Sequence, residues 1–144
     1  MFASDGEAVT RLSSVVQYAL LAAMDLAAHY EPDEPIKAGD IARRTGAPVK
    51  YLGQILLRLK ARALVRSTQG PRGGYRLMRR PELISVAEVM DAVAASEDRR
   101  RRCVTVDDRH ATALQWLSDE IDTARRRLLS HVTLADFVRR ASSA

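Results

Sequence analysis

The sequence predicts a mainly α-helical fold with a small β-hairpin wing: a winged helix-turn-helix domain plus a long dimerisation helix. Three observations predict it. Two short helical segments meet at Gly46, a glycine-rich turn at residues 69–74 joins two strand-like segments, and apolar residues recur at coiled-coil spacing over residues 111–132.

Composition and charge narrow the function classes. With 144 residues, 47% of them hydrophobic, the chain can fill one ordinary core with an appended element. A net charge of +5 favours a polyanionic partner, nucleic acid before an anionic membrane surface. The opening residues lack a signal-peptide pattern, and the longest apolar run is too short to cross a bilayer, so we expect a cytoplasmic protein without a membrane partner.

The first helices follow from spacing and caps. Residues 1–10 are polar without a period and predict a flexible tail. Residues 13–30 predict a helix buried on most of its surface, with Asp25 its only ionised residue. "AGDIARRT" (38–45) predicts a short helix that ends at Gly46 in the left-handed conformation. The next helix starts near Pro48, and its apolar face comprises Val49, Leu52, Ile55, Leu56, Leu59 and Ala63.

A hairpin follows this pair of helices. "LVRST" (64–68) and "YRLM" (75–78) predict strands joined by a long glycine-rich tip. After them, Ser85 and Glu88 have the spacing of a capping box, which predicts the start of another helix. We therefore place the winged helix-turn-helix domain at residues 11–96.

The C-terminal part is predicted as a loop and two helices. Residues 97–110 are charged, lack an apolar period and predict a loop, while residues 111–144 predict the long helix and a short last helix capped by Thr133 and Asp136. The long helix has about 22 residues and a length of roughly 33 Å. Its predicted dimer seam, spaced 3, 4, 3, 4, is Leu114, Leu117, Ile121, Ala124 and Leu128.

A helix-turn-helix with a wing suits DNA, because a helix fits the major groove and its side chains reach base edges. The helix alone could equally be part of a three-helix core with a solvated polar face, and the wing argues against that alternative. The expected DNA contacts are Lys50, Tyr51, Gln54 and Arg58 from the helix and Gln69, Arg72 and Arg76 from the hairpin.

Four motifs carry a family resemblance. "YALLAAMDLA", "DIARRTGAPVKYLGQIL", "ALVRSTQGPRGGYRL" and "TLADF" are similar, in this order, to the Rrf-two family of bacterial winged helix-turn-helix transcription regulators, and the similarity extends over residues 11–140. The resemblance implies a homodimer on an imperfect palindrome, with the third helix in the major groove, the wing in the minor groove and the long helix paired with its counterpart.

We therefore expect a sequence-specific DNA-binding transcriptional regulator, a repressor rather than an activator. No catalytic activity is expected, because "GPRGG" lacks the Lys-Ser/Thr of a phosphate cradle and the sequence offers no Ser/His/Asp set. The alternative function is that of an interaction module, in which a partner protein docks on residues 97–110 and controls the regulator.

The chain departs from the family at the cofactor. Cluster-binding members have three cysteines in the loop before the long helix and one further ligand, which in some lies just before the first-helix tyrosine. Here the loop contains only Cys103, and Gln17 occupies the other position. Because a [2Fe-2S] cluster normally needs four thiolate or imidazole ligands, we expect no conventional iron-sulfur cluster and no metal cofactor.

Three roles for Cys103 stay open at this point. It is, in order of preference, an inert remnant, a redox sensor whose thiolate is favoured by the arginines at 99–102, or a metal ligand together with Asp107, Asp108 and His110. The four arginines are either a solvated loop or a contact for an anionic effector or phosphate.

Overall fold

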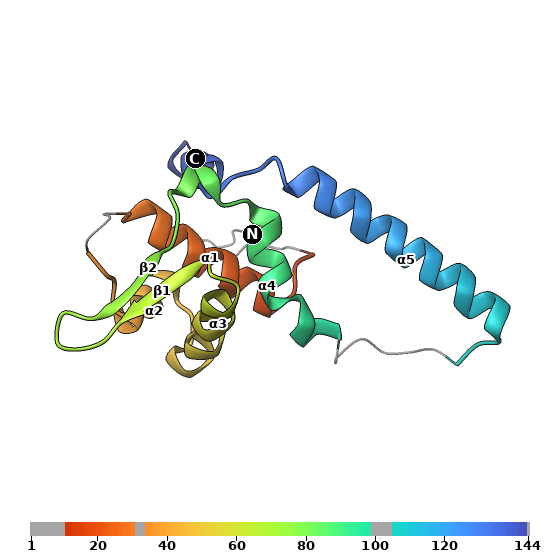
Figure 1. The fold of residues 1–144 in the computed structure, drawn as a ribbon, viewed down its shortest axis with the longest axis horizontal. Helices are drawn as coiled ribbons and strands as arrows, with labels where there is room; N and C mark the ends of the chain where they lie inside the picture. The colour runs from red at the N-terminus through yellow and green to blue at the C-terminus, as the bar shows by residue number, and fades with distance from the viewer. Residues whose placement is uncertain (1–10, 31–33, 99–104, 144) are drawn as a thin grey trace, which may run out of the picture.

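The computed structural model describes residues 11–30, 34–98 and 105–143 (Figure 1). The predicted tail at 1–10, the arginines at 99–102 and Cys103 lie outside these residues. In chain order the elements are α1 (Ser14–Ala28), α2 (Ala38–Thr45), α3 (Val49–Ala61), β1 (Val65–Thr68), β2 (Gly74–Leu77), η1 (Pro81–Leu83), α4 (Val86–Asp98), α5 (Asp108–Leu129) and α6 (Leu134–Ser142).

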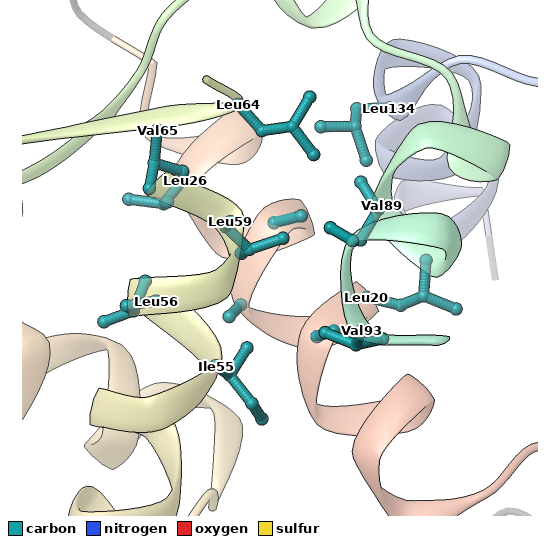
Figure 2. Close-up of a cluster of buried hydrophobic side chains, with 14 of the residues drawn as sticks. Leu20, Leu26, Ile55, Leu56, Leu59, Leu64, Val65, Val89, Val93 and Leu134 are labelled. Carbon is teal, nitrogen blue, oxygen red and sulfur yellow. The ribbon is translucent and has the colours of Figure 1, made fainter. Parts of the chain in front are cut away.

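The core forms around α1, which packs against α2, α3, α4 and α6. Most of α1 is buried, as its apolar spacing predicts. Figure 2 shows side chains from α1, α3, β1, α4 and α6 meeting in one cluster, with Leu26, Leu59 and Leu134 almost completely buried. Each such side chain stabilises the fold by roughly 1.5–3 kcal/mol.

The helix-turn-helix forms as predicted at its turn. Gly46 ends α2 with a φ of 75°, a left-handed conformation that costs glycine little. The apolar face predicted for α3 is wrong at its two ends, because Val49 is exposed and Ala63 is exposed beyond the last helical residue. Ala63, with a φ of 55°, is instead the turn that leads α3 into β1.

The predicted hairpin is confirmed, with Val65 opposite Leu77 and Thr68 opposite Gly74 in an antiparallel pair. A third segment supports it. The amide of Ile36 donates to the Tyr75 carbonyl at 2.8 Å, and the amide of Tyr75 donates to the Ile36 carbonyl at 2.7 Å. A Cβ at Gly74 would lie 2.5 Å from that Ile36 carbonyl oxygen, so only glycine allows this close approach.

Two capping boxes begin α4 and α6. The hydroxyl of Ser85 accepts from the Glu88 amide at 3.1 Å while the Glu88 carboxylate accepts from the Ser85 amide at 2.9 Å, and Thr133 and Asp136 repeat the arrangement. Both boxes were predicted. The two caps also pair with each other: the Val86 amide donates to Val132 at 2.8 Å and the Leu134 amide donates to Ile84 at 2.9 Å. This bridge joins the two caps at the base of α5.

The long helix is shifted from its predicted bounds of 111–132. It begins at Asp108, because the Asp107 side chain caps it by accepting from the His110 amide at 3.0 Å, and it ends at Leu129. Since α4 continues to Asp98, helices extend into both ends of the predicted loop. Figure 1 shows α5 projecting from the body, and no residue of α5 is buried. Arg126 Nε lies 3.3 Å from Asp91 Oδ2 of α4.

No helix within the described residues has the length and apolar character to cross a membrane.

Candidate nucleic-acid interface

The two sides of α3 differ sharply. One side is buried through Leu52, Ile55, Leu56 and Leu59. At 100° per residue, the opposite side is lined by Lys50, Gln54, Leu57 and Ala61, all of which are exposed. Of the predicted contacts, Lys50 and Gln54 therefore lie together on the outward side of α3.

Tyr51 and Arg58 lie nearer the flank of α3, and both are partly buried. The Tyr51 ring meets the Tyr18 ring of α1 edge to face, with 5.6 Å between the centroids and 78° between the planes. This contact fixes the start of α3 against α1. The two tyrosines also line a shallow groove with Ser14, Pro48, Lys50 and Gln54, and this groove borders the outward side of α3.

The wing presents its polar residues at the tip. Gln69 and Arg72 are exposed, and Gly70 takes a φ of 102° between them. Arg76 lies on β2, opposite Arg66 of β1, and is partly buried. The wing is also tied to α3, since Lys60 Nζ donates to the Ser67 hydroxyl at 2.8 Å. The predicted wing contacts thus divide into two exposed tip residues and one on the strand.

This region is strongly basic. Residues 41–81, which contain the end of α2, α3 and the wing, include eleven Lys and Arg residues and no Asp or Glu. Three of these arginines pair with carboxylates from outside the stretch, Arg43 with Asp40, Arg44 with Asp25 and Arg79 with Glu88, which offsets part of the positive charge. This acid-free stretch is visible in the sequence, but the prediction considered only the charge of the whole chain. A surface with an excess of positive charge attracts a polyanion over the distance of a Debye length, about 8–10 Å.

A buried ion pair holds α2 against α1. Arg44 Nε and Nη2 each donate to one oxygen of the Asp25 carboxylate at 2.8 Å, and Asp25 is only 8% exposed. These hydrogen bonds raise the pKa of Arg44 above its ordinary value. The sequence singles out Asp25 as the ionised residue of its helix but does not reveal a partner 19 positions away. The pair holds the C-terminal end of α2 against α1 and so helps to set the orientation of α3, which follows it.

The predicted seam of α5 is uncovered in the single chain. Leu114, Leu117, Ile121, Ala124 and Leu128 are exposed, as is Trp116 beside them. Contiguous apolar surface of this kind marks an interaction site.

The acidic residues before α5 have a structural role. Asp107 caps the helix and its Oδ1 lies 2.7 Å from Nδ1 of His110. Within residues 11–30, 34–98 and 105–143, no group of three or more His, Cys, Asp or Glu side chains is placed to hold a metal ion. The proposed ligand set with Cys103 includes a residue outside these ranges.

Comparisons with known proteins agree with this geometry. A family profile, Rrf2, described as an iron-dependent transcriptional regulator, matches residues 12–140. The HTH-type transcriptional regulator IscR of Yersinia enterocolitica is 37% identical over 135 residues, which cover 89% of this chain and 79% of that protein.

Solved structures show the same fold. IscR of T. potens aligns with 92% of this chain and 88% of its own, with a TM-score of 0.69 and 26% identity. CymR of B. subtilis, titled the global cysteine regulator, aligns over 92% of this chain and 98% of its own, with a TM-score of 0.68 and 24% identity.

Proposed function

Because the chain belongs to the Rrf2 family of DNA-binding transcriptional regulators and is not an enzyme, we propose that it is a homodimeric cytoplasmic repressor of a palindromic operator. In this proposal α3 enters the major groove and the wing tip follows the adjacent minor groove.

One observation carries the DNA contact: the outward side of α3 and the wing belong to the stretch with eleven basic and no acidic residues. Phosphate neutralisation by Lys and Arg supplies most non-specific affinity, and base edges supply specificity. Lys50 and Arg72 suit phosphates or the narrow minor groove, whereas the Gln54 amide can pair with adenine.

The exposed seam of α5 supports the homodimer. A 22-residue helix without a buried residue has no stabilising core of its own in the single chain. Pairing with α5 of a second copy covers the seam with an identical one, and such a symmetric contact brings two α3 helices to two half-sites.

We propose further that no conventional iron-sulfur cluster controls the regulator. The family is described as iron-dependent, yet a cluster needs four ligands and the chain has one cysteine. The donor set therefore does not fit. Control by Cys103 oxidation and control by a docked partner protein are the two alternatives. Two experiments separate them. A partner-controlled regulator should copurify with its partner protein. A thiol sensor should change its DNA affinity on oxidation, and Cys103→Ser should abolish that response.

The DNA proposal is tested by selecting duplexes from a random library with the wild-type protein and measuring affinity by fluorescence anisotropy. We expect enriched palindromes. Lys50→Ala and Arg72→Ala should each weaken binding and, where the residue contacts a phosphate, lower the salt slope by about one per subunit, which is about two for the dimer. Gln54→Ala should relax preference at one position of each half-site.

The control is Arg139→Ala, which removes an exposed arginine of α6, an element distant from α3 in sequence. Its affinity should equal that of the wild type. Enrichment of no sequence, or an equal loss for Arg139→Ala and Arg72→Ala, would contradict the proposed interface.

A further inference from the structure

Leu57 is an apolar side chain on the outward side of α3. It is 61% exposed and lies on the face opposite the buried leucines, between the polar side chain of Gln54 and exposed Ala61. The apolar face predicted for α3 did not include it, so neither the core nor the predicted DNA contacts account for this leucine. A single exposed leucine is ordinary on a protein surface; its position relative to Lys50 and Gln54 is what carries the argument.

The spacing of these residues is that of a recognition helix. Lys50, Gly53, Gln54 and Leu57 follow the pattern i, i+3, i+4, i+7, with which a helix in the major groove presents successive side chains to base edges. Leu57 lies about 10 Å along the helix axis from Lys50, or roughly three base-pair steps. A helix that places Lys50 and Gln54 against base edges of the major groove therefore also brings Leu57 to base edges, about three base-pair steps further along.

The surface beside Leu57 is open. A Cβ built on Gly53, one turn before Leu57, meets nothing within 4 Å, so the helix surface is open there, and Gln54 is the exposed side chain beside it. In the major groove, the bases present hydrogen-bond donors and acceptors and a single apolar group, the C5-methyl of thymine. Among the base edges, that methyl group is the specific apolar partner for a leucine on this face.

We propose that Leu57 contacts the C5-methyl group of a thymine in each half-site and is thereby a specificity-determining residue. The inference rests on the proposed function, because it requires α3 in the major groove. It adds a base identity, thymine, to a face on which the polar residues alone would be read as the only specificity contacts.

The test removes the methyl group and the leucine separately. Starting from the duplex selected by the wild type, each thymine is replaced singly by deoxyuridine, which lacks the C5-methyl and keeps every hydrogen-bonding group. We expect one position per half-site at which wild-type affinity falls about fourfold. For Leu57→Ala the same replacement should have no effect. On the unmodified duplex this variant should bind about sixteenfold more weakly, because it removes the contact from both half-sites of the dimer.

The matched control is Leu83→Ala, in η1 beside α6, where the leucine is 60% exposed. It should respond to every deoxyuridine as the wild type does. Because both leucines are exposed, thermal unfolding of the two variants should match that of the wild type.

Three results overturn the inference. In the first, Leu57→Ala remains as sensitive as the wild type at every thymine. In the second, Leu57→Ala loses affinity equally for all sequences. In the third, Leu57→Ala changes the oligomeric state, which would assign the leucine to an interface with a second copy or another protein. Failure of the proposed function looks different, since the wild type would then enrich no duplex and Lys50→Ala would bind unchanged.

Discussion

At the scale of single residues, Asp25 and Arg44 link the domain core to the helix-turn-helix. Asp25 is the one buried charged residue within the described part of the chain, and both its oxygens accept hydrogen bonds from the Arg44 guanidinium. A buried carboxylate is costly without a partner, whereas an exposed ion pair contributes little. Removing the arginine should therefore lower the free energy of unfolding by more than the loss of an exposed ion pair would, because it leaves the Asp25 carboxylate buried without a partner.

Arg44→Ala is expected to lower the free energy of unfolding by about 2 kcal/mol. This is less than the roughly 3–5 kcal/mol for breaking a fully buried pair, because the Arg44 side chain is 33% exposed. Arg43→Ala is the control, since Arg43 is 73% exposed and pairs with Asp40 on the surface; its change should stay within about 0.5 kcal/mol. Urea denaturation measures both, and equal losses would contradict the role of the buried pair.

At this scale, the sequence predicts which side chains are exposed better than it predicts which side chains touch. Lys50, Gln54 and Arg72 could be predicted as exposed because helical spacing and turn chemistry are local. Tyr51 could not be placed against Tyr18, nor Arg44 against Asp25, because each contact joins residues far apart in sequence. Leu57 was visible as an apolar residue off the buried face, but its significance depends on knowing which side of α3 remains open.

At the scale of elements, the wing depends on its contact with the segment before α2. The two hydrogen bonds between Ile36 and Tyr75 extend the hairpin to a third segment, and Gly74 is the residue that lets the backbones meet. A two-stranded hairpin is marginally stable alone, so this anchor sets the direction in which Arg72 points.

Gly74→Ala should separate the wing from that anchor, because the new Cβ would lie 2.5 Å from the Ile36 carbonyl oxygen. We expect destabilisation by about 1–3 kcal/mol and weaker DNA binding. Gly39→Ala, where an added Cβ meets nothing within 4 Å, should keep or raise stability. Thermal unfolding and anisotropy report the two effects; wild-type DNA affinity in Gly74→Ala would show that the anchor does not position the wing.

The carboxylates of the two capping boxes should make the fold less stable at acidic pH. Burial by itself would raise the pKa of Glu88, but hydrogen bonds from the Arg79 guanidinium and the Ser85 amide outweigh it and hold the pKa below its ordinary value of 4.5. Hydrogen bonds from the Thr133 amide and hydroxyl lower the pKa of Asp136 as well. Both carboxylates therefore stabilise the fold when ionised.

For Glu88 the sign follows from linkage. A pKa lowered by folding gives stability that is fully present above the ordinary value of 4.5 and is lost as pH falls through the folded value. Glu88→Gln should be less stable than the wild type at pH 7, and the difference should shrink below pH 4.5. Denaturation across this range measures it. The exposed Glu82→Gln is the control, and a pH-independent difference for Glu88→Gln would contradict the prediction.

At the scale of the whole molecule, α5 is the helix whose apolar seam is left uncovered in its own chain: Arg126 lies 3.3 Å from Asp91 of α4, but no residue of α5 is buried. Ile121 lies at the centre of its exposed seam, and Thr123 is exposed on the opposite side of the helix. These two positions allow the same charge to be placed inside and outside the proposed dimer contact.

Ile121→Asp should give a monomer of 16.0 kDa by sedimentation equilibrium, because a carboxylate buried in the seam would be unpaired. Thr123→Asp should remain a dimer. Operator affinity should fall about a hundredfold or more with Ile121→Asp alone, since two linked domains gain effective concentration that free monomers lack. A dimer in Ile121→Asp would place the contact elsewhere.

Much of the architecture could be predicted from local patterns. Gly46, the "QGPRGG" tip and the two capping boxes each mark an end of an element, and the structure confirms them. The ends of α5 could not be predicted from its seam, because Asp107 rather than an apolar residue determines where the helix starts. The bridge between the two caps joins Ser85 and Thr133, which are 48 positions apart in the sequence, so no local pattern predicts it.

The bridge between Ser85 and Thr133 lies close to the C-terminal end of α5, so the position of the rest of the helix depends on how rigidly this end is held. Two hydrogen bonds fix the chain just beyond the C-terminal end of α5, and Arg126 of its last turn lies 3.3 Å from Asp91 of α4. Because α5 is a rod of about 33 Å, a rotation of about 5° at this end displaces its far end by roughly 3 Å. This is close to one base-pair step of about 3.4 Å. In the proposed dimer, the stiffness of the contacts at this end of α5 therefore limits how much variation in half-site spacing the protein can accept.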